Sequence, residues 1–137
     1  MADAQLKPDA VSAALAELSA LAECAFRGDD ATRDYYANDV FWQPGIRPLG
    51  VAMPESAETA AHAVGICTNA GIAVVPRGGG MSYSKGYLPA HEHAVVFDMR
   101  KLNRVVDVNA DDLYITVEAG CTWEQVNAAL APVRRQH

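Results

Sequence analysis

The sequence has no long apolar run. Half of its 137 residues are hydrophobic, but no uninterrupted apolar stretch approaches the roughly 20 residues that a membrane-spanning helix needs. Its first ten residues, MADAQLKPDA, carry acidic side chains and no apolar core, so the sequence predicts no signal peptide. We therefore expect a soluble globular protein with no membrane span and with a hydrophobic core of its own.

Cysteine is scarce and follows no pattern. Cys24, Cys67 and Cys121 are odd in number and far apart, so they indicate neither a disulfide framework nor a set of metal ligands. We interpret each thiol as a small buried apolar group in a reducing cytoplasm. The sequence predicts no metal site.

Basic residues are also few. The chain has 11 Lys and Arg against 17 Asp and Glu, which gives a formal net charge of -6 and a pI of about 5.0. A nucleic-acid-binding surface depends on a concentration of positive charge against the phosphates. A DNA or RNA partner is therefore not expected.

The N-terminal part predicts one long helix followed by a loop. Asp9 is a good N-cap and Gly28 a plausible stop. Apolar residues recur at helical spacing between them, at Val11, Leu15, Leu18, Ala22 and Ala25. The stretch 29–48 is polar and aromatic with two prolines, so we expect mainly ordered loop, with Asp29 and Asp30 in a solvated turn.

Beyond residue 48 the pattern alternates between strands and helices. Short apolar runs predict strands at 49–54, 72–76, 94–100, 104–112 and 113–120. Helices are predicted from Ser56 to Ala70, and over 122–132, where Thr122 and Gln125 have the spacing of a capping box. Ile115 and Val117 alternate with Thr116 and Glu118, as in a strand with one wet face. The fold class is α+β or mixed α/β.

A glycine loop interrupts this pattern at PRGGGMSYSKGY, residues 76–87. Without Cβ atoms, consecutive glycines can point several backbone N–H groups at one anion, and a diphosphate is the common cellular case. Arg77 would add a fork of donors, and Ser82, Tyr83 and Ser84 would add hydroxyls. Contiguous glycines followed by a strand match neither the dinucleotide fingerprint nor the Walker pattern. A plain glycine-rich connection without a ligand remains the alternative.

Two long stretches resemble a known family. GVAMPESAETAAHAVGICTNAGIAVVPRGGGMS and HAVVFDMRKLNRVVDVNADDLYITVEAGCTWEQVNAAL are similar, in order, to the FAD-binding domain of the vanillyl-alcohol oxidase and p-cresol methylhydroxylase (PCMH) superfamily. This superfamily of FAD-linked oxidases includes glycolate oxidase and D-lactate dehydrogenase types. The resemblance runs from about Val51 to Leu130. It implies the N-terminal α/β subdomain of a PCMH-type domain, with the glycine loop between strands.

The resemblance also implies a cofactor and its contacts. The loop amides would hold the diphosphate of FAD, and the contacting stretch carried over is Pro76, Arg77, Gly78, Gly79, Gly80, Met81, Ser82 and Tyr83. Some relatives have a histidine just after the paired glycines that bonds covalently to the flavin. Met81 stands there in this chain and cannot do the same, so we expect non-covalent FAD.

The resemblance divides the chain into an N-terminal helix over 1–32, an FAD-binding subdomain over 33–131 and an atypical tail over 132–137. The family continues into a second half of the FAD domain and a substrate domain, so we expect a truncated chain whose catalytic residues are unknown. One hypothesis is the FAD-binding part of a cytoplasmic oxidoreductase acting on an alcohol or hydroxy acid. The other is a non-catalytic nucleotide-binding fragment or module that needs a second chain or its missing half. Self-association or a partner chain is expected in that case.

Overall fold

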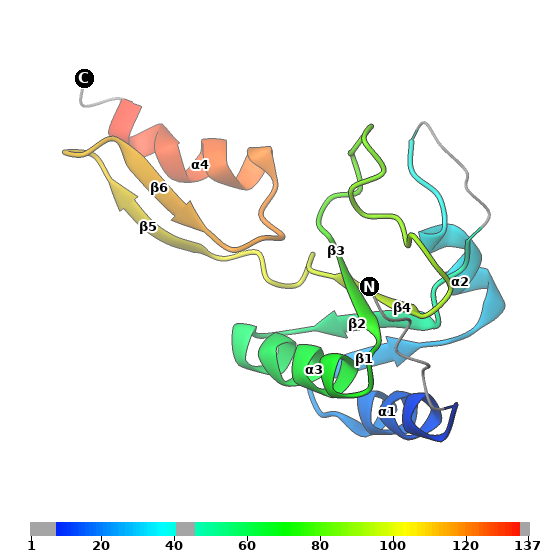
Figure 1. Ribbon diagram of the computed structural model, residues 1–137. Coiled ribbons are helices and arrows are strands. Elements are labelled where there is room, and N and C mark those ends of the chain that lie inside the picture. Colours follow the sequence, from blue (N-terminus) through cyan, green and yellow to red (C-terminus); the bar gives the residue numbers. More distant parts are fainter. Residues whose placement is uncertain (1–7, 41–45, 135–137) are drawn as a thin grey trace.

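The computed structural model describes residues 8–40 and 46–134, which form two units (Figure 1). Helices and strands alternate in the larger unit, and the smaller unit is a helix on a β-hairpin. The larger comprises α1 (Pro8–Ala20), β1 (Cys24–Arg27), α2 (Asp30–Tyr36), β2 (Gly50–Pro54), α3 (Ala57–Asn69), β3 (Ala73–Arg77) and β4 (Ala94–Asp98). The smaller comprises β5 (Val105–Asn109), β6 (Tyr114–Val117) and α4 (Trp123–Arg134). The mixed α/β fold class is confirmed.

Strand β4 lies inside the four-stranded sheet, whose order is β1-β2-β4-β3. It runs parallel to both of its neighbours, whereas β1 is antiparallel to β2. Val95 and Phe97 pack into a core with residues of α1 and α3, and Val96 packs on the opposite face with Tyr36 and Val51. A strand covered on both faces explains the uninterrupted apolar run AVVF.

The N-terminal helix is shorter than predicted. Helix α1 ends at Ala20, Glu23 turns the chain with φ of 57°, and Cys24–Arg27 form strand β1. The prediction of one helix to Gly28 is therefore wrong beyond Ala20. These four residues pair with β2 and form the edge strand of the sheet. This tertiary contact overrides the helical propensity of the alanine-rich segment.

A short helix occupies part of the predicted loop. Helix α2 begins after Asp29, whose carboxylate accepts hydrogen bonds from the backbone N–H and the hydroxyl of Thr32, at 2.9 Å and 2.8 Å. These bonds lower the pKa of Asp29 below its ordinary value. The interpretation of Asp29 as a solvated turn residue missed this capping role.

The remaining elements agree with the sequence pattern. Ser56 caps α3, and Gly71 follows that helix with φ of 73°. Thr122 and Gln125 form the predicted capping box, since each accepts a hydrogen bond from the backbone N–H of the other. Helix α4 extends to Arg134, and the last three residues of the predicted tail, 135–137, lie outside the described residues.

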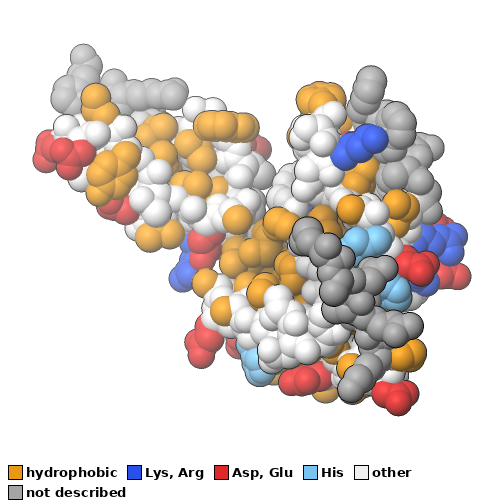
Figure 2. Space-filling model, in the orientation of Figure 1, with side chains coloured by type: hydrophobic (Ala, Val, Ile, Leu, Met, Phe, Trp, Pro, Cys, Tyr) orange, Lys and Arg blue, Asp and Glu red, His pale blue; other side chains and the backbone are white. Residues whose placement is uncertain are grey.

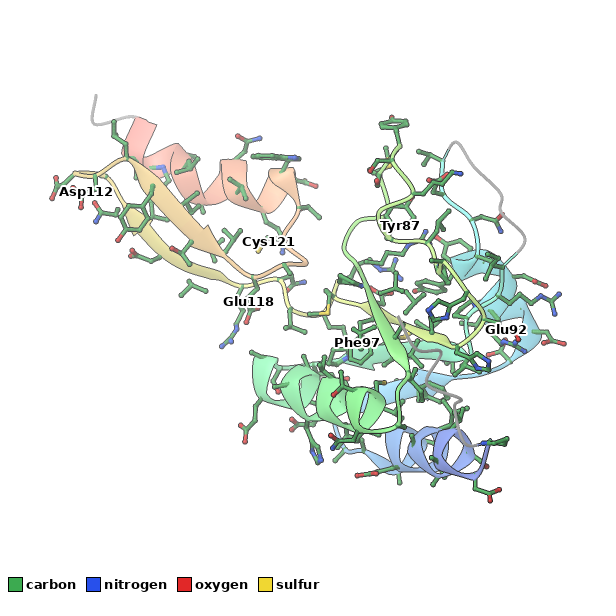
Figure 3. The ribbon with its side chains drawn as sticks, in the orientation of Figure 1. Tyr87, Glu92, Phe97, Asp112, Glu118 and Cys121 are labelled. Carbon is green, nitrogen blue, oxygen red and sulfur yellow. The ribbon has the colours of Figure 1, made fainter. Side chains whose placement is uncertain are left out.

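Two crossing segments, 99–104 and 118–121, connect the units. The backbone N–H of Gly120 donates to the carbonyl of Leu102 at 2.8 Å. A Cβ on Gly120 would lie 2.1 Å from the carbonyl oxygen of Met99 and 2.8 Å from that of Leu102. Because both obstacles are backbone atoms, only glycine permits this approach. Glu118 and Cys121, labelled in Figure 3, flank the crossing.

A polar cluster joins α2 to the end of β4, with Tyr36 and Asp98 buried and Arg100 exposed. The hydroxyl of Tyr36 donates to Asp98, and the guanidinium of Arg100 donates to both oxygens of that carboxylate, at 2.6 to 3.0 Å. Burial opposes ionisation of Asp98, but the bonds from Arg100 and Tyr36 outweigh it and lower the carboxyl pKa. Burial, followed by the bond to Asp98, raises the pKa of Tyr36 to about 12.

Within residues 8–40 and 46–134, none of the helices is long and apolar enough to cross a membrane. The three cysteines are free thiols, of which Cys24 and Cys67 are buried as predicted and Cys121 is half-buried. Burial raises the pKa of Cys67 to about 11.

We predict that Gly120→Ala lowers the free energy of unfolding by roughly 1–3 kcal/mol, because the new methyl group forces the crossing segments apart. Gly65→Ala is the matched control: its Cβ meets nothing within 4 Å inside α3, so higher helix propensity should stabilise the protein by about 0.5–1 kcal/mol. Denaturant titration measures both changes. Equal effects of the two substitutions would contradict the packing argument.

We predict that Asp98→Asn removes part of the acid sensitivity of the fold. A depressed folded pKa stabilises the protein above the unfolded carboxyl pKa of about 3.9, and this stabilisation is lost as the pH falls through the folded value. The substitution should cost about 1.5–3 kcal/mol at pH 7 and progressively less at acidic pH. Denaturant titrations from pH 7 to pH 2 measure the cost of the substitution at each pH. Asp107→Asn, at an exposed carboxyl, is the control. A cost independent of pH would exclude this account.

Candidate cofactor site

The glycine loop begins where β3 ends, at the carboxyl edge of the parallel strands β2, β4 and β3 (Figure 1). Arg77 pairs with Asp98 in the last step of the β3–β4 ladder, and the N–H of Met99 donates to the carbonyl of Arg77 at 2.9 Å. Open sheets with parallel strands bind ligands outside this edge. The ladder therefore places residues 78–80 where a ligand is expected.

Each of the three glycines has its own steric role. A Cβ on Gly78 would lie 3.2 Å from the carbonyl oxygen of Ala119, so the loop passes close to the crossing segment. Gly80 has φ of 75°, and a Cβ there would meet the guanidinium of Arg77 at 3.0 Å. A Cβ on Gly79 would meet nothing within 4 Å. The loop is thus packed at both ends and open in the middle.

The open centre of the loop suits an anion. Among hydrogen bonds between described residues, the backbone N–H groups of Gly79 and Gly80 have no acceptor. Consecutive N–H groups around a left-handed residue form an anion-binding nest, and the positive φ of Gly80 supplies that conformation. The residues present therefore fit an anionic group such as the diphosphate of FAD.

Arg77 differs from its predicted role. Its side chain is only 9% exposed, and its guanidinium lies 4.5 to 5.4 Å from the ring centroids of Tyr35, Tyr36 and Tyr87. Nη1 also donates to the carbonyl of Asn38 at 3.1 Å. Each such cation–π contact contributes about 0.5–2 kcal/mol. The side chain is thus engaged within the protein, and direct contact between Arg77 and the cofactor stays a prediction.

The other predicted contacts lie on the loop surface. Pro76 is exposed, and the side chains of Met81 and Tyr83 are 66% and 69% exposed. The hydroxyl of Ser82 accepts a bond from the N–H of Ser84 at 3.2 Å and so shapes the turn. Met81, Ser82 and Tyr83 are accessible to a ligand, and their contact with it stays a prediction.

The sequence interpretation missed Tyr87. This buried residue lies in the connection between β3 and β4 (Figure 3), and its hydroxyl donates to the carbonyl of Gly80 at 2.6 Å. Its ring also faces Arg77. No local spacing signals this role, because it depends on the loop folding back on itself.

A pocket of about 570 Å³ adjoins the end of β4. It is lined by paired charges, including Asp98 with Arg100 and Glu55 with Lys101. Within the described residues, no group of three or more His, Cys, Asp and Glu side chains has the arrangement of a metal site.

Comparison with known proteins agrees with this geometry. Residues 48–135 match the family model described as the FAD binding domain. Over 103 residues the chain is 34% identical to the D-lactate dehydrogenase [cytochrome] of Kluyveromyces lactis, covering 74% of this chain and 18% of that protein. It is also 34% identical over 103 residues to the D-2-hydroxyglutarate dehydrogenase of Xanthomonas citri, covering 74% of this chain and 21% of that protein. The chain thus spans about a fifth of these relatives.

Solved structures show the same fold at lower identity. p-Cresol methylhydroxylase with substrate bound superposes with a TM-score of 0.76 at 17% identity, over 95% of this chain and 26% of that one. The 4-ethylphenol oxidase of Gulosibacter chungangensis, in complex with isoeugenol, also has a TM-score of 0.76, at 23% identity, over 96% of this chain and 26% of that one. The predicted PCMH-type fold is confirmed.

The family match includes the strand, the glycine loop and the crossing segment that form the candidate site. It supports FAD as the cofactor of this domain. The chain belongs to the FAD binding domain family.

Proposed function

We propose that the chain is the FAD-binding portion of a flavin-dependent oxidoreductase whose substrate is a hydroxy acid. The observation that carries this proposal is the Gly78–Gly80 turn, which is open at Gly79 and lies at the carboxyl edge of the parallel strands. The names of the relatives, D-lactate dehydrogenase and D-2-hydroxyglutarate dehydrogenase, support the substrate class.

The stretch from Pro76 to Tyr83 would hold the cofactor. Backbone N–H groups of the glycines orient and stabilise the diphosphate charge, and Ser82 and Tyr83 offer hydroxyl donors beside it. Met81 carries a thioether, which has no proton to lose and so cannot form the neutral flavin bond that a histidine nitrogen forms. We therefore propose that FAD is held non-covalently. When bound, FAD supplies the acceptor for the two electrons removed from a hydroxyl-bearing carbon.

A non-catalytic module that acts with a second chain is the alternative. Val106, Leu113, Tyr114 and Trp123 are 50–86% exposed on the smaller unit, where Figure 2 shows hydrophobic side chains across the visible face. Apolar side chains gathered on a surface favour association. We propose self-association or a partner chain there, which analytical ultracentrifugation would test.

We propose a cytoplasmic location as well. The supporting observation is that all three cysteines are free thiols, two of them buried, as is usual in reducing compartments. Fractionation of cells that express the tagged full-length protein would test this location.

We predict that purified protein, incubated with FAD and then separated from unbound FAD, shows the absorbance spectrum of bound flavin. We also predict that acid precipitation of the protein releases the flavin into the supernatant. Release follows because residue 81 is methionine and forms no flavin bond. Flavin that stays with the acid precipitate would contradict non-covalent binding. Failure to retain any flavin would contradict the cofactor proposal itself.

We predict that the full-length protein, loaded with FAD, reduces an artificial electron acceptor with D-lactate or D-2-hydroxyglutarate as the donor. Gly79→Val should lower flavin content and the rate at least tenfold, because a branched side chain fills the open face of the loop. Gly65→Ala should leave both unchanged. Bound flavin without reduction by any hydroxy acid would favour the non-catalytic module.

A further inference from the structure

The guanidinium of Arg77 is surrounded by groups from two separate segments, residues 35–38 and the connection between β3 and β4. Tyr35 and Tyr36 belong to α2, Asn38 follows that helix, and Tyr87 closes the connection between β3 and β4. Among the described residues, no carboxylate forms an ion pair with Arg77. Its positive charge is stabilised by the rings of Tyr35, Tyr36 and Tyr87 and by one backbone carbonyl. We call these three rings around Arg77 the aromatic cage.

The cage touches the glycine loop directly. A Cβ on Gly80 would lie 3.0 Å from Nη2 and 3.1 Å from Nε of Arg77, so the guanidinium fills the space beside this glycine. Tyr87 holds the same residue from another direction, because its hydroxyl bonds to the carbonyl of Gly80. Gly80, which has the positive φ on which the anion nest depends, is therefore fixed by two side chains of the cage.

We propose that Arg77 is a positioning residue: with Tyr87 it holds Gly80 in the conformation that binds the cofactor, and it does so without touching the cofactor. This inference rests on the proposed binding of FAD at the loop. It changes the role that the sequence suggested for Arg77, from a donor to the diphosphate to a support beneath the loop. It also assigns a role to Tyr87, which lies outside the loop residues predicted to contact FAD.

The test combines two variants with two measurements on the full-length protein. Arg77→Met removes the charge, and Tyr87→Leu removes the ring and the hydroxyl. Each should weaken FAD binding, measured by flavin fluorescence, roughly tenfold, the scale of one cation–π contact. The double variant should be weaker by much less than a hundredfold, because both substitutions remove the same support.

The second measurement needs no cofactor. Trypsin cleavage after the exposed Lys85, identified by fragment mass in protein without FAD, should be faster in both variants because the loop loses its anchor. The control is Arg27→Met, which removes the same charged group from an exposed position away from the loop. Tyr87→Phe, which keeps the ring and loses only the hydroxyl, should give a smaller increase and serves if Tyr87→Leu does not fold.

Weaker FAD binding in Arg77→Met, with unchanged cleavage in both variants, would show direct contact with the diphosphate and overturn the proposal. Additive losses in the double variant would overturn it too. If the unsubstituted protein binds no FAD, the proposed function fails. The cleavage rates then still decide whether Arg77 and Tyr87 hold the loop.

Discussion

The parallel pairing of β3 with β4 is the constraint on which the rest of the structure depends. Five consecutive residue pairs, from Ala73 with Ala94 to Arg77 with Asp98, fix the register. A shift by one residue would turn Val95 and Phe97 away from the helices and expose them. The same register brings Arg77 and Asp98, which are both buried, to the end of the ladder.

Tyr36 contacts both of these charged residues. Its ring faces the guanidinium of Arg77, and its hydroxyl bonds to Asp98. Helix α2, which carries Tyr36, is thereby attached both to the aromatic cage and to the Asp98–Arg100 pair. The cage supports the glycine loop, and the pair leads into the crossing segment, where Gly120 allows the smaller unit to approach. One tyrosine thus links the sheet, the loop and the chain between the two units.

Much of this could be predicted from the sequence. The apolar runs, the Thr122–Gln125 capping box and the glycine cluster are local signals, and the elements from β2 to α4 follow them. Strand β1 could not be predicted in this way, because Cys24–Arg27 become a strand only by pairing with β2. A local signal for α2 was present, because Asp29 stands three residues before Thr32, the spacing of an N-cap and its bonded N–H. The prolines and aromatic residues of 29–48 led instead to the prediction of a loop.

The candidate loop can be recognised in the sequence, but the contacts that hold it cannot. The three glycines indicate a nest on their own, because the need for a missing Cβ is visible in the sequence. The cage around Arg77 is not visible, because its rings come from positions 35, 36 and 87, and only the fold brings them together. An arginine beside a glycine loop looks like an anion ligand until its neighbours in space are known.

The bond from Tyr87 to Gly80 closes residues 80–87 into a small ring of chain. Because this bond holds the two ends of the segment together, substitutions from Met81 to Gly86 need not shift Gly80 or the sheet. Mutation could therefore vary the surface that the loop presents while the geometry of the nest is inherited intact. Such an arrangement would let related proteins diverge in how they treat the same cofactor without redesigning the fold that holds it.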